Sequence, residues 1–172
     1  MLTGPLQVVQ DELDQLIAVI KATFLAEHND DGTHSSTLTP KTGSWVPTIG
    51  GTTSETGQTY SIRVGRYVRI GNLVWITGIA ILTAKGTITG NITIKGLPFT
   101  ADATPNLFHF PKYFFNNFTT PIVDISGTIA PGRNEASVKI LTAAATSYTD
   151  AVTADIGDTT QISLTATYLA AE

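Results

Sequence analysis

Cysteine is absent from this chain of 172 residues. A disulfide framework, a thiolate metal site and a cysteine nucleophile are therefore excluded, and the fold must depend on packing alone. Charge is also sparse, with ten Lys and Arg against fourteen Asp and Glu and a formal net charge of -4. Because binding to nucleic-acid phosphates needs a clustered positive field, this balance argues against a nucleic-acid partner.

Long hydrophobic runs are missing as well. No stretch approaches the roughly 18 consecutive apolar residues of a membrane span. The opening residues, MLTGPLQVVQDELDQ, contain neither a basic n-region nor an apolar h-region. We therefore expect a soluble protein that has no membrane insertion and no secretion signal of its own. The length fits one globular domain with an appendage.

Residues 5–27 have a helical period, which begins with Pro5 at a first helical position. Apolar residues follow at alternating spacings of three and four, as in the a and d positions of a heptad: Leu6, Val9, Leu13, Leu16 and Ile20. A lone helix of this length is marginal in water, so the seam must be covered. It either packs on its own domain or forms a short parallel coiled coil. We favour a coiled coil of three identical chains, because Ile17 and Phe24 widen the seam.

A polar turn, HNDDGTH, follows the helix and brings two histidines close to two aspartates in sequence. A trimer could gather three copies of His28 or His34 around its axis, with Asp30 and Asp31 as further ligands. The spacing of the two histidines matches neither a helical HxxxH pair nor an HxH on a strand. We therefore interpret this segment as a helix stop and hinge, and predict neither a metal nor another cofactor.

From Trp45 onward the chain has a β pattern, in which Thr, Val and Ile alternate with polar residues between glycines and prolines. Strands are predicted at residues 59–64, 67–70, 73–82, 88–95, 120–129, 136–141 and 161–169. Gly71-Asn72 is a tight hairpin signal, and both Gly65 and Gly71 are expected to adopt positive φ. Residues 142–155 are interpreted as a short helical turn or a loop.

These patterns predict a mainly β chain in two parts. Residues 1–36 form the helix and turn, for oligomerisation and attachment to another protein. Residues 37–172 form an antiparallel β-sandwich or jelly roll.

Four segments carry a resemblance to known proteins: GSWVPTIGGT, TYSIRVGRYVRIGNLVWITGIAIL, GTITGNITIKGLPF and TTQISLTATYLA. Together they resemble a β-sandwich module of bacteriophage and prophage virion proteins of the tail-fibre, spike or head-appendage type. The segment FLAEHNDDGTH also resembles the junction that such proteins place after an N-terminal helix. The resemblance implies a homotrimeric structural or adhesive protein of the virion, assembled in the bacterial cytoplasm, and not an enzyme.

The segment of residues 106–121, NLFHFPKYFFNNFTTP, is more aromatic than the resemblance leads us to expect. Its six aromatic residues are more than one strand face can bury, which makes them receptor-binding candidates: Phe108, Phe110, Tyr113, Phe114, Phe115 and Phe118. Core packing or a trimer interface is the alternative use of these side chains. Trp75 lies among apolar neighbours and is predicted to be buried, whereas Trp45 is left open.

Catalysis finds little support in the sequence. His109 lies among aromatic residues, and the chain has no G-x-S-x-G nucleophile elbow. Four separated acids could meet in space as glycosidase carboxylates do, although nothing in the sequence requires it: Asp124, Glu135, Asp155 and Asp158. We therefore predict no catalytic residues.

Three functions remain open. The first is a tail-fibre protein that attaches to a polysaccharide or protein of the host surface, and we prefer it because of the aromatic segment. The second is a head, collar or capsid decoration without receptor binding. The third is a carbohydrate-binding module.

Overall fold

The computed structural model describes residues 5–27 and 39–171, with helix side chains described from residue 10 to residue 22. The chain divides into two compact units, Met1–Pro40 and Lys41–Glu172. The first contains the helix and the second all of the strands, so each is described by itself below.

The helix α1 spans Pro5–Glu27. Its side chains from residue 10 to residue 22 are all exposed, including the seam residues Leu13, Leu16 and Ile20. The side chains of Leu6 and Val9, also predicted for oligomerisation, lie outside the described residues. Within the part of the chain that is described, no helix combines the length and apolar character needed to cross a membrane.

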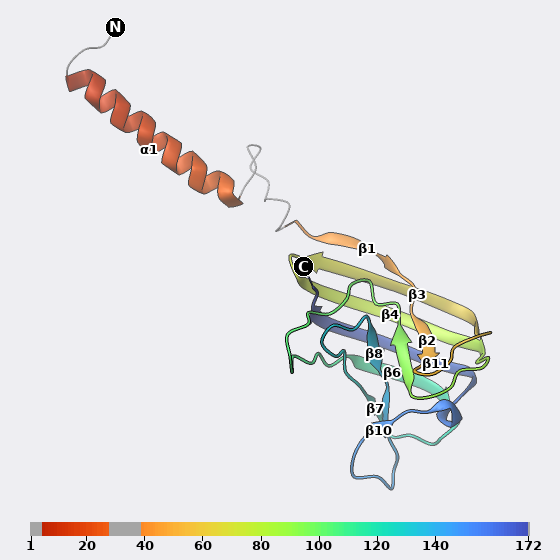
Figure 1. Cartoon of the computed structure of the whole chain (residues 1–172). Coiled ribbons are helices and arrows are strands. Elements are labelled where there is room, and N and C mark those ends of the chain that lie inside the picture. Colours follow the sequence, from red (N-terminus) through yellow and green to blue (C-terminus); the bar gives the residue numbers. More distant parts are fainter. Residues whose placement is uncertain (1–4, 28–38, 172) are drawn as a thin grey trace. The chain divides into compact units, whose positions relative to one another are not determined.

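The β unit consists of eleven strands and one turn of 3-10 helix (Figure 1). In chain order these are β1 (Lys41–Trp45), β2 (Thr48–Gly51), β3 (Thr59–Ile70), β4 (Leu73–Ala84), β5 (Ile92–Lys95), β6 (Lys112–Phe118), β7 (Asp124–Ser126), β8 (Glu135–Ser137), β9 (Lys139–Leu141), β10 (Thr149–Asp150), η1 (Thr153–Asp155) and β11 (Ile156–Leu169). Every pairing between these strands is antiparallel. The chain is therefore mainly β, with one N-terminal helix.

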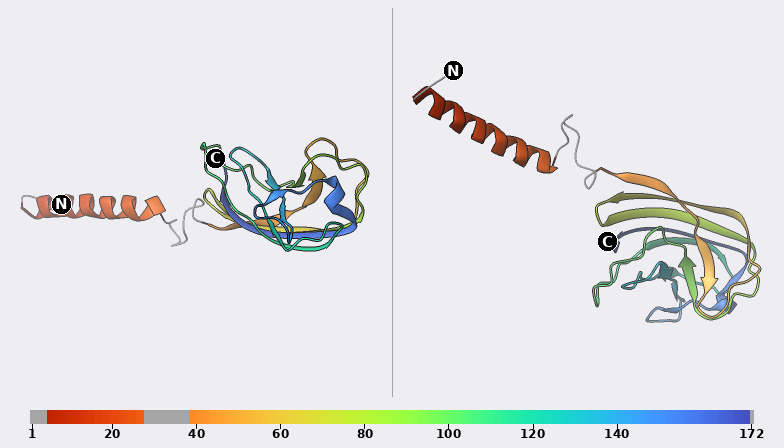
Figure 2. Two further views of the ribbon diagram at one scale, coloured as in Figure 1. Left: turned by 90° about the horizontal axis from the view of Figure 1, so that it is seen from below. Right: turned by 45° about the horizontal axis from the view of Figure 1, so that its top comes forward.

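The strands form one large sheet and two small ones. The large sheet has the order β1-β3-β4-β11-β6, and the small sheets have the orders β10-β9-β7 and β2-β5-β8. Figure 2 shows the long strands curving around the shorter ones, which lie on one side of them. We call the covered side of the large sheet its inner face and the opposite side its outer face. The architecture is sandwich-like, with one long layer and one broken layer.

The core lies between the inner face and the small sheets. Alternate residues of β4 and β11 point into it: Val74, Ile76, Ala80 and Leu82, and Ile162, Leu164, Ala166 and Tyr168. The small sheets contribute buried residues from the other side, among them Ile49, Ile92, Ile94, Ala136 and Ile140. Because neighbouring residues of a strand point to opposite faces, the other half of β4 and β11 occupies the outer face.

Trp45 lies in the core and crosses the inner face of the large sheet beside two glycines. A Cβ at Gly65 would lie 2.3 Å from Nε1 of Trp45, and one at Gly78 would lie 2.7 Å from its Cζ2. The indole Nε1 donates to the carbonyl of Thr77 at 3.1 Å. Gly65 was expected to take positive φ in a turn, and this is wrong, because β3 runs through it without a break. Because Gly65 has no side chain, it leaves room for the ring of Trp45.

The hairpin at Gly71-Asn72 is confirmed, with Gly71 at φ 56° between β3 and β4. The predicted burial of Trp75 is wrong, because its side chain is 44% exposed on the outer face. The strand predicted at 120–129 is reduced to β7, and β6 was not predicted as a strand at all. Residues 142–155, interpreted as a helical turn or a loop, contain the short β10 and η1.

Candidate functional site

Three of the six aromatic residues proposed for receptor binding point toward the core. The Tyr113 hydroxyl donates to the carbonyl of Ser137 at 2.6 Å, and burial raises the pKa of this phenol. Phe115 and Phe118 pack against the core and meet edge to face, with ring centroids 5.8 Å apart. Their contacts are those of structural side chains, since an interior aromatic ring cannot stack on an external ligand.

The other three aromatic residues are exposed. Phe108 and Phe110 precede β6, and the Phe110 side chain is 75% exposed. Phe114 pairs with Ser163 of β11, which places it on the outer face of the large sheet. The predicted cluster is therefore divided by strand alternation, and only Phe108, Phe110 and Phe114 can contact a partner directly.

His109 lies between the two exposed phenylalanines and faces the other way. Its ring meets Tyr168 edge to face at 6.1 Å, and its backbone pairs with Ile129. Nε2 is buried and has no hydrogen-bond partner among the described residues. Burial lowers the pKa of His109, and the charge of Asp102 opposes this effect. The neutral ring is thus favoured, as expected of a core histidine.

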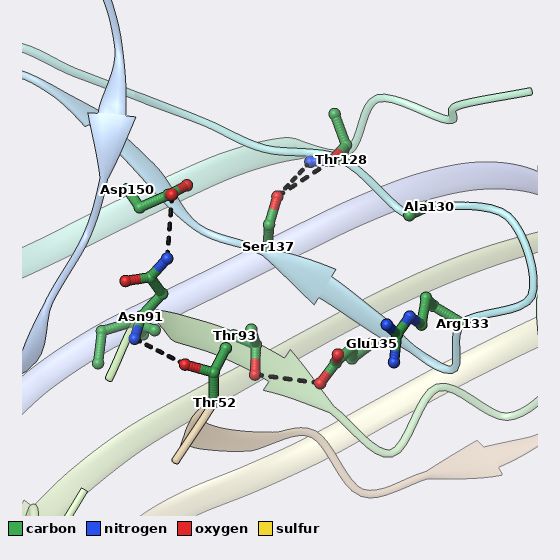
Figure 3. A pocket seen from close by; sticks show the side chains of 10 residues that line it. Thr52, Asn91, Thr93, Thr128, Ala130, Arg133, Glu135, Ser137 and Asp150 are labelled. Atoms are coloured by element: carbon green, nitrogen blue, oxygen red, sulfur yellow. Dashed lines mark hydrogen bonds between the residues drawn. The ribbon is translucent and has the colours of Figure 1, made fainter. Parts of the chain in front are cut away.

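A polar pocket of about 180 Å³ lies beside β5 and β8, on the side of the molecule formed by the short strands (Figure 3). Its lining is rich in hydroxyl, amide and carboxylate groups: Thr52, Asn91, Thr93, Thr128, Ser137, Arg133, Glu135 and Asp150. Of these lining residues, Glu135 alone was a functional candidate from the sequence. The others come from segments far apart in the chain, and no sequence motif joins them into one site.

Hydrogen bonds within the pocket engage most of these groups. Asn91 Nδ2 donates to Asp150 Oδ2 at 3.0 Å, and the other oxygen of that carboxylate accepts from Lys139 Nζ at 2.5 Å. Thr93 Oγ1 donates to Glu135 Oε2 at 3.4 Å. The pocket is also smaller than the roughly 300–1,000 Å³ usual for small-molecule sites. Its groups can hydrogen-bond a hydroxyl-bearing ligand, but the short strands already use them to hold one another.

The four separated acids do not gather in this pocket, which only Glu135 reaches. Asp124 accepts a hydrogen bond from the Tyr148 hydroxyl, which lowers the pKa of that carboxyl. Asp155 is buried at η1 and accepts from the amide of Val152 at 2.8 Å. Asp158 accepts from the amide of Lys85 at 2.9 Å. Asp155 therefore stabilises its own turn, whereas Asp124 and Asp158 each tie together segments that are far apart in the sequence.

Metal ligands do not cluster in the described part of the chain, where no three His, Asp or Glu side chains come together as a candidate site. The HNDDGTH turn with His28, His34, Asp30 and Asp31 lies outside the described residues. Its interpretation as a hinge stays a prediction.

Comparison with known proteins gives a fold and no family. No family model matches the chain, and no curated protein matches it. Among solved structures, the chain is similar to the crystal structure of the Dettilon tailspike protein, with a TM-score of 0.57 and 12% sequence identity. The match covers 75% of this chain and 23% of the tailspike chain. The β architecture is thus one that occurs as part of a much longer phage tailspike.

Proposed function

We propose that this chain is a structural component of a bacteriophage virion, and that three copies form a tail-fibre or spike module that attaches to the host cell surface. The observation that carries the proposal is the fold shared with part of a tailspike over three-quarters of the chain. The segments GSWVPTIGGT and GTITGNITIKGLPF point to the same class of protein. The proposal assigns no catalytic step and no cofactor.

The surfaces of the chain fit such a role. The exposed seam of α1 supplies a surface for association with identical helices or with another virion protein. Phe108 and Phe110 supply exposed rings that can stack on a sugar or pack on a surface protein. Three such patches on one particle gain avidity of about 10²–10⁴ over a single weak contact when the receptor is repetitive.

A head or collar decoration without receptor binding is the second candidate. The observation that favours it is that the β unit presents its exposed apolar side chains mainly on one broad sheet face, which suits packing against protein better than binding a small ligand. In that case the chain would bind purified capsids and no cells.

The test is binding of the fluorescently labelled chain to a panel of bacterial strains. The full chain is compared with a chain lacking residues 1–36 and with the double variant Phe108→Ser, Phe110→Ser. Val123→Ser is the matched control, because Val123 is an exposed apolar residue outside the aromatic segment.

The proposal predicts strain-specific binding that weakens without the helix and is lost in the double variant, while the control binds as the unaltered chain does. Absence of binding to every strain would contradict receptor binding, and association with capsids would then establish the decoration.

A further inference from the structure

The polar pocket beside β5 and β8 has a buried hydroxyl group at its base. Ile92 and Ile94 of β5 belong to the core, so Thr93 between them points to the opposite side of the β2-β5-β8 sheet, where the pocket lies. Thr93 is nevertheless only 5% exposed, because the segments that line the pocket cover it. The pocket therefore encloses a polar side chain outside the hydrophobic core.

The hydroxyl group of Thr93 is poorly satisfied by the chain itself. Its described hydrogen-bond partner is Glu135 Oε2 at 3.4 Å, whereas O–H···O hydrogen bonds are normally about 2.5–3.0 Å long. Burying a hydroxyl group without a good hydrogen bond is unfavourable. A ligand oxygen that enters the pocket and bonds to this group would thus be favoured.

Arg133 and Glu135 bring opposite charges to the lining that do not pair with each other. In the part of the chain that is described, the two ion pairs are formed by Lys95 and Lys139 with other carboxylates. The guanidinium of Arg133 has five N–H donors, and the carboxylate of Glu135 has an oxygen beyond the one that faces Thr93. The pocket thus offers a strong donor and a strong acceptor to a ligand.

The other end of the pocket is fixed by internal hydrogen bonds that leave an acceptor open. Asn91 Nδ2 donates to Asp150 Oδ2 at 3.0 Å, and the amide oxygen of Asn91 remains able to accept. Figure 3 shows Asn91 and Asp150 at the end of the pocket away from Arg133. Because these groups are already held in place, little side-chain entropy would be lost when a ligand binds.

The volume of the pocket suits one sugar ring. A cavity of about 150 Å³ is large enough to bind benzene, which is a six-membered ring. The pocket measures about 180 Å³, and three of its lining residues are exposed around its mouth: Thr52, Asn91 and Arg133. A six-membered sugar ring can therefore enter it while the ring remains joined to the rest of a glycan outside.

The charges of the lining favour a neutral ligand. An anion attracted by Arg133 would be repelled by Glu135 and Asp150, and a cation attracted by the two carboxylates would be repelled by Arg133. Two adjacent hydroxyl groups satisfy both kinds of partner, because one can donate to Glu135 while the other accepts from Arg133. Ala130 and Ile92 supply apolar surface for the C–H groups of the ring.

We propose that this pocket binds one neutral sugar residue of a glycan, held by adjacent hydroxyl groups between Arg133 and Glu135 and above the hydroxyl of Thr93. The site is separate from the exposed rings of Phe108 and Phe110. It also stands without the receptor attachment proposed above, since it is argued from the lining of the pocket alone.

The test is saturation-transfer difference NMR of the full chain with free sugars, because this method detects weak ligands of a large protein. The panel contains the methyl glycosides of neutral sugars, namely glucose, galactose, mannose, N-acetylglucosamine and rhamnose. Methyl glucuronide and methyl glucosaminide are the anionic and cationic counterparts of the glucose glycoside. Titration of the sugars that give a signal provides their dissociation constants.

The variant that tests the site is Arg133→Ala, with Arg66→Ala as its matched control. Both arginines are exposed, but Arg66 lies on β3 in the large sheet, away from the pocket. Thr93→Val is the second variant, because it removes the hydroxyl group and keeps the branched shape of the side chain. Circular dichroism of each variant reports whether the β unit is folded.

We expect at least one neutral sugar to bind the unaltered chain and Arg66→Ala equally. Its dissociation constant should rise by about tenfold or more in Arg133→Ala, because hydrogen bonds to a charged group are lost. Thr93→Val should also bind more weakly while its circular dichroism stays unchanged.

Three results would overturn the proposal. Absence of binding by every sugar would show that the pocket is not a sugar site. Unchanged binding in Arg133→Ala would place the sugar elsewhere on the chain. Tighter binding of a charged counterpart than of the neutral glucose glycoside would contradict the selection by charge. Cell binding is a separate measurement, so failure of receptor attachment would be recognised independently of these outcomes.

Discussion

At the scale of single residues, the core of the β unit depends on the fit between Trp45 and the glycines beneath it. Gly65 and Gly78 pair with each other across β3 and β4 and lie under the indole ring. Neither needs glycine for its backbone conformation, since positive φ occurs at other glycines. Their role is therefore steric, and it can be tested by adding one methyl group.

Gly65→Ala is expected to lower the free energy of unfolding by about 1–3 kcal/mol, because the new Cβ meets the Trp45 ring and forces it to move. Gly157→Ala is the control, since its Cβ would meet its nearest neighbour, Thr119 Oγ1, at 3.7 Å in ordinary contact. Urea denaturation measures both variants. Equal stability of the two would contradict the fit described here.

His109 predicts a pH dependence of stability. Burial lowers the pKa of the folded ring below its ordinary value near 6.5, so the unfolded chain binds more protons than the folded chain does just below that pH. Stability is therefore fully present above pH about 6.5 and falls as the pH drops through that value toward the lower folded pKa. His109→Leu removes this group.

Urea denaturation of both proteins at neutral and mildly acidic pH measures the effect. The variant should lose less stability on acidification than the unaltered chain. An identical loss in the two proteins would show that the ring titrates alike in the folded and unfolded states.

The orientation of single side chains was the least predictable feature. The segment LVWITGIAIL has apolar residues at both alternations, so periodicity could not tell which half faces the core. Trp75 was assigned to the wrong half for this reason. In NLFHFPKYFFNNF the same difficulty concealed the division between Tyr113, which faces inward, and Phe114, which faces outward. Only the sheet pairing resolves such cases.

At the scale of elements, α1 carries an apolar seam that is exposed to solvent at the described positions. Leu13, Leu16 and Ile20 are exposed on the helix, and Gln10 Nε2 donates to Asp14 Oδ1 at 3.0 Å one turn further on. Burial of a leucine against partner helices contributes about 1.5–3 kcal/mol, so a charge at one seam position should have a large effect on association.

Leu16→Glu is expected to raise the dissociation constant of the assembly by about tenfold or more, because it removes a buried leucine and adds a carboxylate to the seam. Ala18→Glu adds the same charge outside the seam and serves as the control. Analytical ultracentrifugation over a range of concentrations measures both. A Leu16→Glu variant that associates as tightly as the control would show that the seam is not the contact between helices.

Elements encoded by a local sequence signal were predicted well, whereas features that depend on contacts between distant segments were predicted poorly. The hairpin between β3 and β4 was found because Gly71 and Asn72 encode it within two residues. The edge strand β6 was missed, because its run of aromatic and asparagine residues has no clear alternation of polarity. The pocket beside β5 and β8 could not be predicted at all, since Asn91, Arg133 and Asp150 meet only through the folding of separate loops.

At the scale of the whole molecule, each exposed apolar surface has a separate proposed role. We propose that the seam of α1 joins copies of the chain and that Phe108 and Phe110, which precede β6, contact the receptor.

The mass of the full chain in solution tests this account most directly. Native mass spectrometry or light scattering at the concentration of the cell-binding assay gives the number of chains. For the proposed homotrimer we expect three times the chain mass of 18.2 kDa. A single chain or a pair of chains at that concentration would contradict the trimer and, with it, the presentation of three receptor-binding patches on one particle.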